Sequence, residues 1–141
     1  MKRYIQRRRT PHNRKGASAI EFALIAPLMI LFTFGLVELG RMMLVKQTAT
    51  HATREGARMA VRPTANRDEV IQRVQDELAL LSISSATIET VPESFEDADP
   101  GSEVTVRVRI DIGTVSWIPD WFEYDVTDIV AESCMRREST D

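Results

Sequence analysis

Residues that form covalent cross-links and metal sites are scarce in this chain. Among its 141 residues there is one cysteine, Cys134, and there are two histidines, His12 and His51. A single cysteine excludes an intrachain disulfide, and the sequence contains neither a CxxC pair nor a Cys/His cluster with zinc spacing. A Ser/His/Asp set and a phosphate-binding loop are missing as well. We therefore expect no enzyme activity, no cofactor, no metal site and no small-molecule substrate.

Acidic residues are missing from residues 1–16, which hold seven of the 18 basic residues. The other 11 basic residues stand against 21 acids, so the chain after Gly16 is strongly acidic. Such a surface repels phosphates, which argues against nucleic acid as a partner of the folded part. The basic segment precedes an apolar run directly, and this order favours a membrane role over a nucleic-acid-binding arm.

Charge is also missing from residues 22–37, which read FALIAPLMILFTFGLV. As a helix this run is about 24 Å long, and extension back to Ala17 gives about 31 Å, which matches a hydrocarbon core of about 30 Å. We predict a transmembrane helix over residues 17–37, with Glu21 near one edge and Glu38 at the far water boundary. Because seven cations precede the run and only Arg41 and Lys46 follow closely, residues 1–16 are predicted to be a cytoplasmic leader and the bulk of the chain to lie outside the cytoplasm.

The helical pattern continues beyond the apolar run. Apolar and small residues recur in steps of four, three, four and four at Val45, Ala49, Ala52, Gly56 and Ala60, and Pro63 supplies a stop. We predict an extracytoplasmic continuation of the helix over residues 38–63. Glycine costs a helix about 1 kcal/mol relative to alanine, so we expect a close backbone approach at Gly56. Gly35 and Gly40 are further candidate helix-packing positions. The stripe can pack on the chain's own domain or form a seam between subunits.

The pattern of residues 64–141 predicts a small extracytoplasmic α+β domain. A helix is expected over residues 67–81, with Asn66 as its N-cap and Val70, Val74, Leu78 and Leu81 on one face. Alternation over residues 104–112 predicts a half-buried strand, and residues 86–91 and about 123–136 are weaker strand predictions. The expected fold class is α+β, in which a long N-terminal transmembrane helix continues as a spine beside a second helix and a small antiparallel sheet.

The most informative segment is Gly16-Ala17-Ser18-Ala19-Ile20-Glu21-Phe22, between the basic leader and the apolar run. It resembles the processing site of type IV pilins and pseudopilins, in which a prepilin peptidase cuts after the glycine and the fifth mature residue is glutamate. The resemblance implies cleavage between Gly16 and Ala17, in an extended site of small residues. It also implies that Glu21 pairs with the terminal amine of a neighbouring subunit and sets the axial register. The alternative is a Glu21 that stays in the headgroup zone.

Two further motifs, GLVELGR at residues 35–41 and REGAR at residues 54–58, resemble the TadE-like family over about residues 14–60. These are minor pilins or pseudopilins of the Flp (tight adherence) pilus system. The resemblance implies a pilin-like spine and a role in pilus assembly and adherence. Its implied partners are a prepilin peptidase, other pilins, the inner-membrane assembly platform and the lipid bilayer. Entry into the pilus shaft and a priming role alone both stay open. A second hypothesis is an uncleaved, signal-anchored periplasmic binding or sensor module.

Three features of the predicted domain leave alternatives open. The first is an acidic stretch that is either a solvated loop or a calcium ligand set, formed by Glu93, Glu96, Asp97 and Asp99. The second is an aromatic group that either caps the core or forms an exposed contact patch, formed by Trp117, Trp121, Phe122 and Tyr124. Cys134 is either a buried small residue or the site of a disulfide between subunits.

Overall fold

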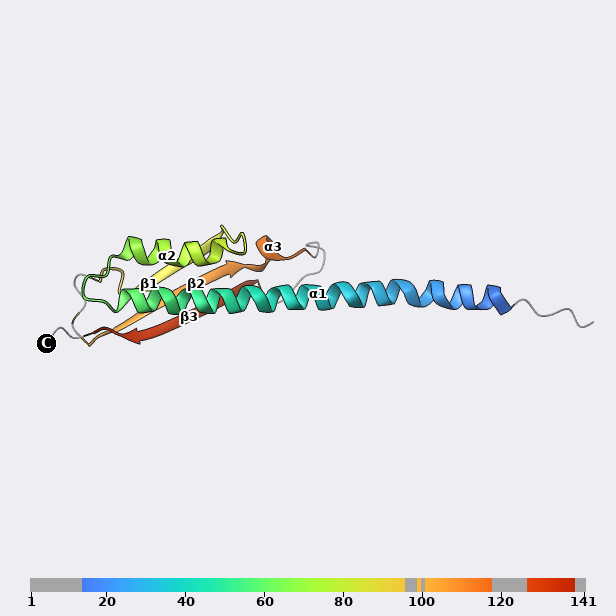
Figure 1. The fold of residues 1–141 in the computed structure, drawn as a ribbon, viewed down its shortest axis with the longest axis horizontal. Helices are drawn as coiled ribbons and strands as arrows, with labels where there is room; N and C mark the ends of the chain where they lie inside the picture. Colours follow the sequence, from blue (N-terminus) through green and yellow to red (C-terminus); the bar gives the residue numbers. More distant parts are fainter. Residues whose placement is uncertain (1–13, 96–98, 100, 118–126, 139–141) are drawn as a thin grey trace, which may run out of the picture. The chain divides into compact units, whose positions relative to one another are not determined.

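The computed structural model describes residues 14–95, 99, 101–117 and 127–138. The elements follow one another in the order α1, α2, β1, β2, α3 and β3 (Figure 1). The chain divides into two compact units, Met1–Val37 and Glu38–Asp141.

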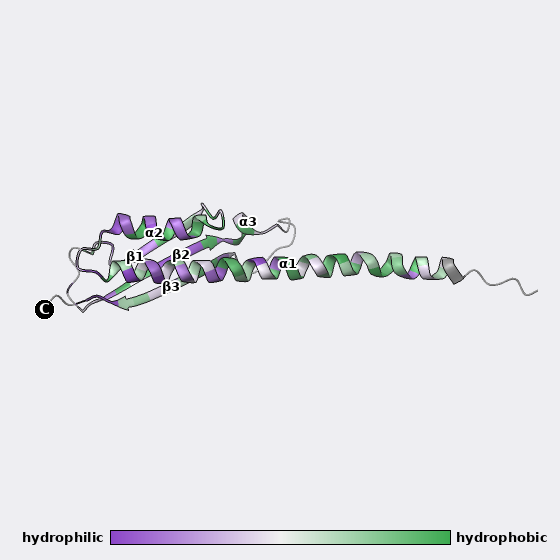
Figure 2. Cartoon of the chain, viewed as in Figure 1, coloured by the Kyte–Doolittle hydropathy of each residue, from purple (hydrophilic) through white to green (hydrophobic). Residues whose placement is uncertain are grey.

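The first unit contains the N-terminal half of helix α1 (Arg14–Ala60). Its large apolar side chains are exposed, including Phe22 at 73% and Leu24 at 74%, and Figure 2 shows this stretch as predominantly hydrophobic. The helix is long and apolar enough to cross a bilayer, which fits a single-pass membrane anchor. It begins at Arg14 and therefore includes Gly16 and Ala17, one turn earlier than the predicted span.

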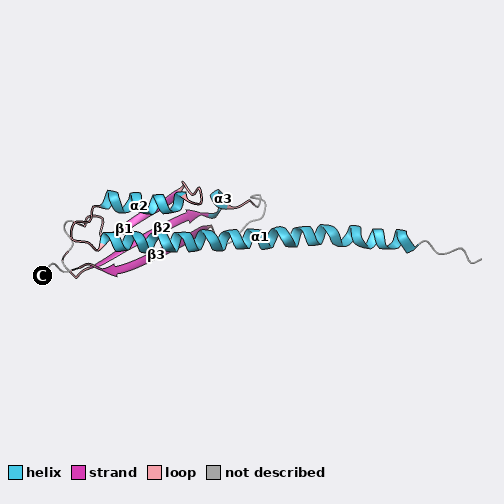
Figure 3. Cartoon of the chain, in the orientation of Figure 1, coloured by secondary structure: helices cyan, strands magenta, loops and turns pink. Residues whose placement is uncertain are grey.

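The second unit is built on a three-stranded antiparallel sheet (Figure 3). Strand β2 (Glu103–Asp111) lies between β1 (Ala86–Val91) and β3 (Asp128–Arg136). The predicted alternation holds along β2, whose buried side chains are Val104, Val106, Val108 and Ile110. On the other face, Arg107 lies 2.8 Å from Glu132 and 3.7 Å from Glu89 on the neighbouring strands.

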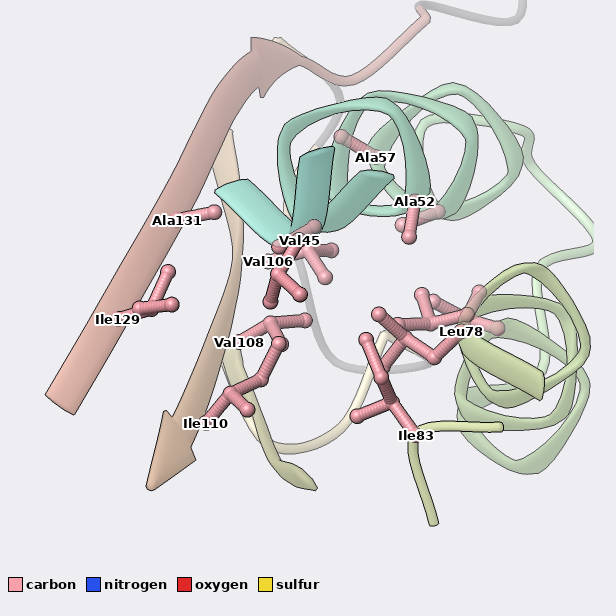
Figure 4. Close-up of a cluster of buried hydrophobic side chains, with 14 of the residues drawn as sticks. Val45, Ala52, Ala57, Leu78, Ile83, Val106, Val108, Ile110, Ile129 and Ala131 are labelled. Carbon is pink, nitrogen blue, oxygen red and sulfur yellow. The ribbon is translucent and has the colours of Figure 1, made fainter. Parts of the chain in front are cut away.

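The C-terminal part of α1 and helix α2 (Arg67–Ala79) cover one face of this sheet (Figure 1). Their apolar stripes meet the valines of β2 in a single core, where Figure 4 shows Val45, Ala52 and Leu78 beside Val106 and Val108. Helix α2 begins where its cap predicts, because the side chain of Asn66 accepts the Asp68 N–H at 2.9 Å. The α+β prediction is confirmed.

Two boundaries differ from the sequence pattern. Ile112 continues the alternation of β2 but opens the short helix α3 (Ile112–Val115), because the Asp111 carboxylate caps the Gly113 N–H at 2.8 Å. The expectation of a strand as far as Ile112 is therefore wrong. Helix α1 ends at Ala60, three residues before Pro63.

The C-terminal residues fasten the sheet to the end of α1. The guanidinium of Arg137 donates hydrogen bonds to the carbonyl oxygens of Phe95 and Pro63. The backbone N–H of Arg137 donates to Ser102 O at 2.8 Å, and that of Glu138 donates to Val61 O at 3.1 Å. Arg137 and Glu138 thus join the end of β3 to the α1–α2 connection and to the β1–β2 connection.

Candidate functional site

The predicted cleavage residues lie in the first turn of α1. Gly16 and Ala17 are exposed, and a Cβ added at Gly16 would meet no described atom within 4 Å. The backbone is helical here, in contrast with the extended site expected from the sequence. The first four N–H groups of a helix have no acceptor within it, so unwinding this turn breaks few hydrogen bonds.

Glu21 lies one turn beyond Ala17 on the same face of α1, about 6 Å along the helix axis. Its side chain is exposed among exposed apolar neighbours, of which Ile20 and Phe22 flank it directly. No hydrogen bond or ion pair of Glu21 is found among the described side chains. The carboxylate is therefore open to a partner from outside the described part of the chain.

The small-residue stripe of α1 packs on the domain of its own chain. Ala49, Ala52 and Ala60 are fully buried in the core. A Cβ at Gly56 would lie 2.6 Å from Cγ2 of Val74 and 3.4 Å from Cγ1 of Val106, so α2 and β2 approach the helix closely at this position. A Cβ at Gly35 or Gly40 would meet no described atom within 4 Å. A packing role for these two glycines stays a prediction that requires another chain.

The REGAR motif combines this packing with a charged pair. Gly56 and Ala57 face the core, whereas Arg58 donates a hydrogen bond of 2.9 Å to the carboxylate of Glu55. This hydrogen bond holds the pKa of Glu55 below its ordinary value. The motif thus supplies a close helix contact on one side and a solvated ion pair on the other.

A polar contact that the sequence pattern does not predict lies at the start of the second unit. Glu38, expected at the water boundary, is only 8% exposed. Its Oε1 accepts hydrogen bonds from Ser116 Oγ at 2.7 Å and from the Trp117 N–H at 3.2 Å. One turn later, Arg41 donates from Nε to Val115 O at 2.6 Å, and its guanidinium carbon lies 4.4 Å from the centre of the Trp117 ring. The available signal was the spacing of three residues between Glu38 and Arg41, which places them on one helix face.

The remaining sequence alternatives are settled in part. Trp117 is 70% exposed, so the expectation that it caps the core is wrong; Trp121, Phe122 and Tyr124 lie outside the described residues. Cys134 is exposed rather than buried, because it lies on the solvent face of β3.

The acidic stretch contains a turn closed by the Ser102 N–H and Asp99 O at 3.0 Å, with Gly101 at a φ of 82°. Glu96 and Asp97 of that stretch lie outside the described residues. In the part of the chain that is described, no group of three or more His, Cys, Asp or Glu residues is arranged to hold a metal ion.

Comparison with known proteins bears on the N-terminal helix. A family profile described as TadE-like protein matches residues 16–58, from the candidate cleavage glycine to the end of the REGAR motif. Neither the curated proteins nor the solved structures give a match. The matched segment contains Glu21, the three candidate packing glycines, and Glu38 and Arg41. Over this segment, about a third of its length, the chain is similar to the TadE-like family.

Proposed function

We propose that this chain is a minor pilin or pseudopilin that takes part in assembly of a Flp/Tad-type pilus. The observation that carries the proposal is Glu21, an exposed carboxylate in the otherwise uncharged stretch of residues 16–37 of α1, five residues after Gly16. The family match begins at the same glycine and supports this function. The role is structural and not enzymatic, in keeping with the pilin-related character of the family.

In this proposal a prepilin peptidase removes the basic leader at the cytoplasmic face of the inner membrane. Residues 17–37 hold the mature chain in the bilayer, residues 38–63 carry the spine outward, and residues 64–141 form the extracytoplasmic domain. Other pilins and the assembly platform contact the exposed apolar surface of α1. This surface is suited to both environments, since lipid tails and neighbouring apolar helices both accept it.

Glu21 supplies the registration between subunits. An unpaired carboxylate in the hydrocarbon costs up to about 3 kcal/mol at the bilayer centre and less near its edge. Cleavage before Ala17 creates an α-amine, and an amine from another subunit would offset this cost. Pairing at one height on each helix fixes the stagger between two spines.

Two measurements test the proposal, one on the membrane-extracted protein and one on the piliation and adherence of cells. N-terminal sequencing should find a mature start at Ala17, and Gly16→Trp should block cutting because it adds bulk beside the scissile bond. Glu21→Gln should be cut normally while piliation and adherence fall, because it keeps the shape and removes the charge. Glu93→Gln removes an exposed acid of the second unit and is the matched control. Fibres at wild-type levels from normally cut Glu21→Gln protein would sink the registration role.

The second hypothesis is an uncleaved periplasmic binding or sensor module. An open groove at the end of α2 favours it, lined by polar residues such as Gln72 and Asp76 and by apolar ones such as Leu78 and Ile83. Electrophoretic mass separates the two functions, since processing removes 16 residues and the leader charges, whereas a signal-anchored module keeps them.

A further inference from the structure

Trp117 has a highly exposed ring, although both its backbone and its ring contact residues of α1. Its ring is 70% exposed, yet its backbone N–H is bound by the Glu38 carboxylate and its ring lies against the Arg41 guanidinium. Arg41 is itself fixed by its hydrogen bond to Val115 O. A large indole is thus presented to the outside in one orientation, although exposure of so much apolar area is unfavourable in water.

The position of this contact along α1 is close to the end of the apolar run. Arg41 follows Val37 by four residues, which is about 6 Å of helix. A bilayer has a hydrocarbon core of about 30 Å within a total of about 40–45 Å, so each headgroup layer is roughly 5–7 Å thick. When residues 17–37 span the core, Arg41 and the ring that lies on it therefore fall within the headgroup layer.

The exposed surface of α1 also stays apolar past Val37. Leu39, Met43 and Leu44 are exposed, whereas Glu38 is buried and Arg41 is partly covered. Lys46 is the first exposed charged side chain after Val37, and its ammonium donates to the Val130 carbonyl of β3. The apolar surface of the span is thus continuous for about two further turns, because the domain covers the charges that would otherwise face lipid.

We propose that Trp117 and Arg41 form an anchor in the lipid headgroup layer at the C-terminal end of the membrane span. Tryptophan favours this layer because its ring is apolar and its N–H is polar, and a guanidinium binds the phosphates of headgroups. The Glu38 carboxylate stays out of lipid contact because Ser116 and the Trp117 backbone satisfy it. In this proposal the anchor holds the domain at the membrane surface before the chain takes part in pilus assembly.

This inference rests on membrane insertion of α1 and is independent of the pilus role. The strongest competing occupant is a second copy of this chain, whose helix would cover the same ring. The two occupants differ in a measurable way, because contact with lipid persists when the protein is diluted in excess lipid, whereas contact between copies is lost.

The experiment uses the full chain with Trp121→Phe in phosphatidylcholine vesicles, so that Trp117 is the one tryptophan. Separate vesicles carry a nitroxide on the headgroup or at the middle of the acyl chain. The control chain carries Val91→Trp with both native tryptophans replaced by phenylalanine. Val91 is exposed at the opposite end of β1 from α3, next to the strand ends that Arg137 fastens to the end of α1.

We expect blue-shifted emission from Trp117 and a larger loss of emission with the headgroup nitroxide than with the mid-chain nitroxide. The tryptophan at position 91 should emit as in water and lose little emission with either label. Two results would overturn the proposal. One is quenching of Trp117 no stronger than that at position 91, which places the ring in water. The other is a blue shift that disappears on dilution into excess lipid, which places the ring against a second copy.

Discussion

Gly56→Ala is the substitution whose effect follows most directly from the structure. The new Cβ would lie 2.6 Å from Cγ2 of Val74, closer than carbon atoms approach in folded proteins, and 3.4 Å from Cγ1 of Val106. Both neighbours are fully buried, β-branched residues whose χ1 rotation is restricted. The clash therefore cannot be relieved by swinging a flexible side chain, and α1 and α2 must move apart.

Two opposing terms decide the size of the effect. Inserting a methyl group into a packed core costs about 1–3 kcal/mol. Replacing glycine by alanine inside a helix stabilises by about 1 kcal/mol. Gly40→Ala is the matched control, because Gly40 lies in the same helix and an added Cβ there meets no described atom within 4 Å. The helix term is common to both variants, so the difference between them measures the packing cost alone, and we expect about 1–3 kcal/mol.

Urea unfolding of the full chain in a mild detergent, followed by tryptophan fluorescence, gives this difference. Gly40→Ala should be more stable than the wild type, and Gly56→Ala should be less stable than Gly40→Ala. A double variant of Gly56→Ala with Val74→Ala should lose less than the sum of the single changes, because the smaller residue makes room for the new methyl group. Equal stabilisation by both alanines would refute the close approach of α2 to Gly56.

Three further predictions concern the second unit. Glu38→Ala removes the acceptor of the Trp117 N–H and should lower the free energy of unfolding by about 1–3 kcal/mol, with a smaller loss for Glu38→Gln, which keeps an acceptor oxygen. Arg137→Ala should lose about 1.5–3 kcal/mol in the same urea assay because its guanidinium donates to two backbone carbonyls, whereas exposed Arg136→Ala should stay within about 0.5 kcal/mol of the wild type. A reporter that is active only in the cytoplasm, fused after Asp141, should be inactive; strong activity would reverse the predicted orientation.

Much of the fold was predictable because its signals are local. One such signal is the uncharged run of residues 22–37, which lacks the polar positions of an amphipathic helix. The others are the side-chain cap at Asn66 and the strict alternation along residues 104–110. Each depends on neighbours within a few residues. Such signals specify helices, caps and buried strand faces before any tertiary contact forms. The end of β2 was not predictable in this way, because the Asp111 carboxylate overrides an alternation that formally continues to Ile112.

The residues of the candidate site also differ in whether the sequence alone predicts their role. Gly16, Ala17 and Glu21 are recognised by their order and spacing in the sequence, and the tertiary structure adds the helical first turn and the exposure of the carboxylate. Glu38 shows the opposite case. Its acceptor role depends on residues 78 and 79 positions away, and periodicity carries no information on contacts over that distance.

Sequence pattern alone therefore specified the long apolar helix, its polar continuation and the strand faces of this protein, because hydrophobic period and charge are properties of short stretches. Folding decided which charges stay hidden and which apolar groups stay exposed. Glu38 is buried because a distant segment supplies two donors, and the exposed Trp117 of that same segment has its ring over Arg41 of α1. Both outcomes arise from long-range packing, which places groups far apart in the chain within hydrogen-bonding distance.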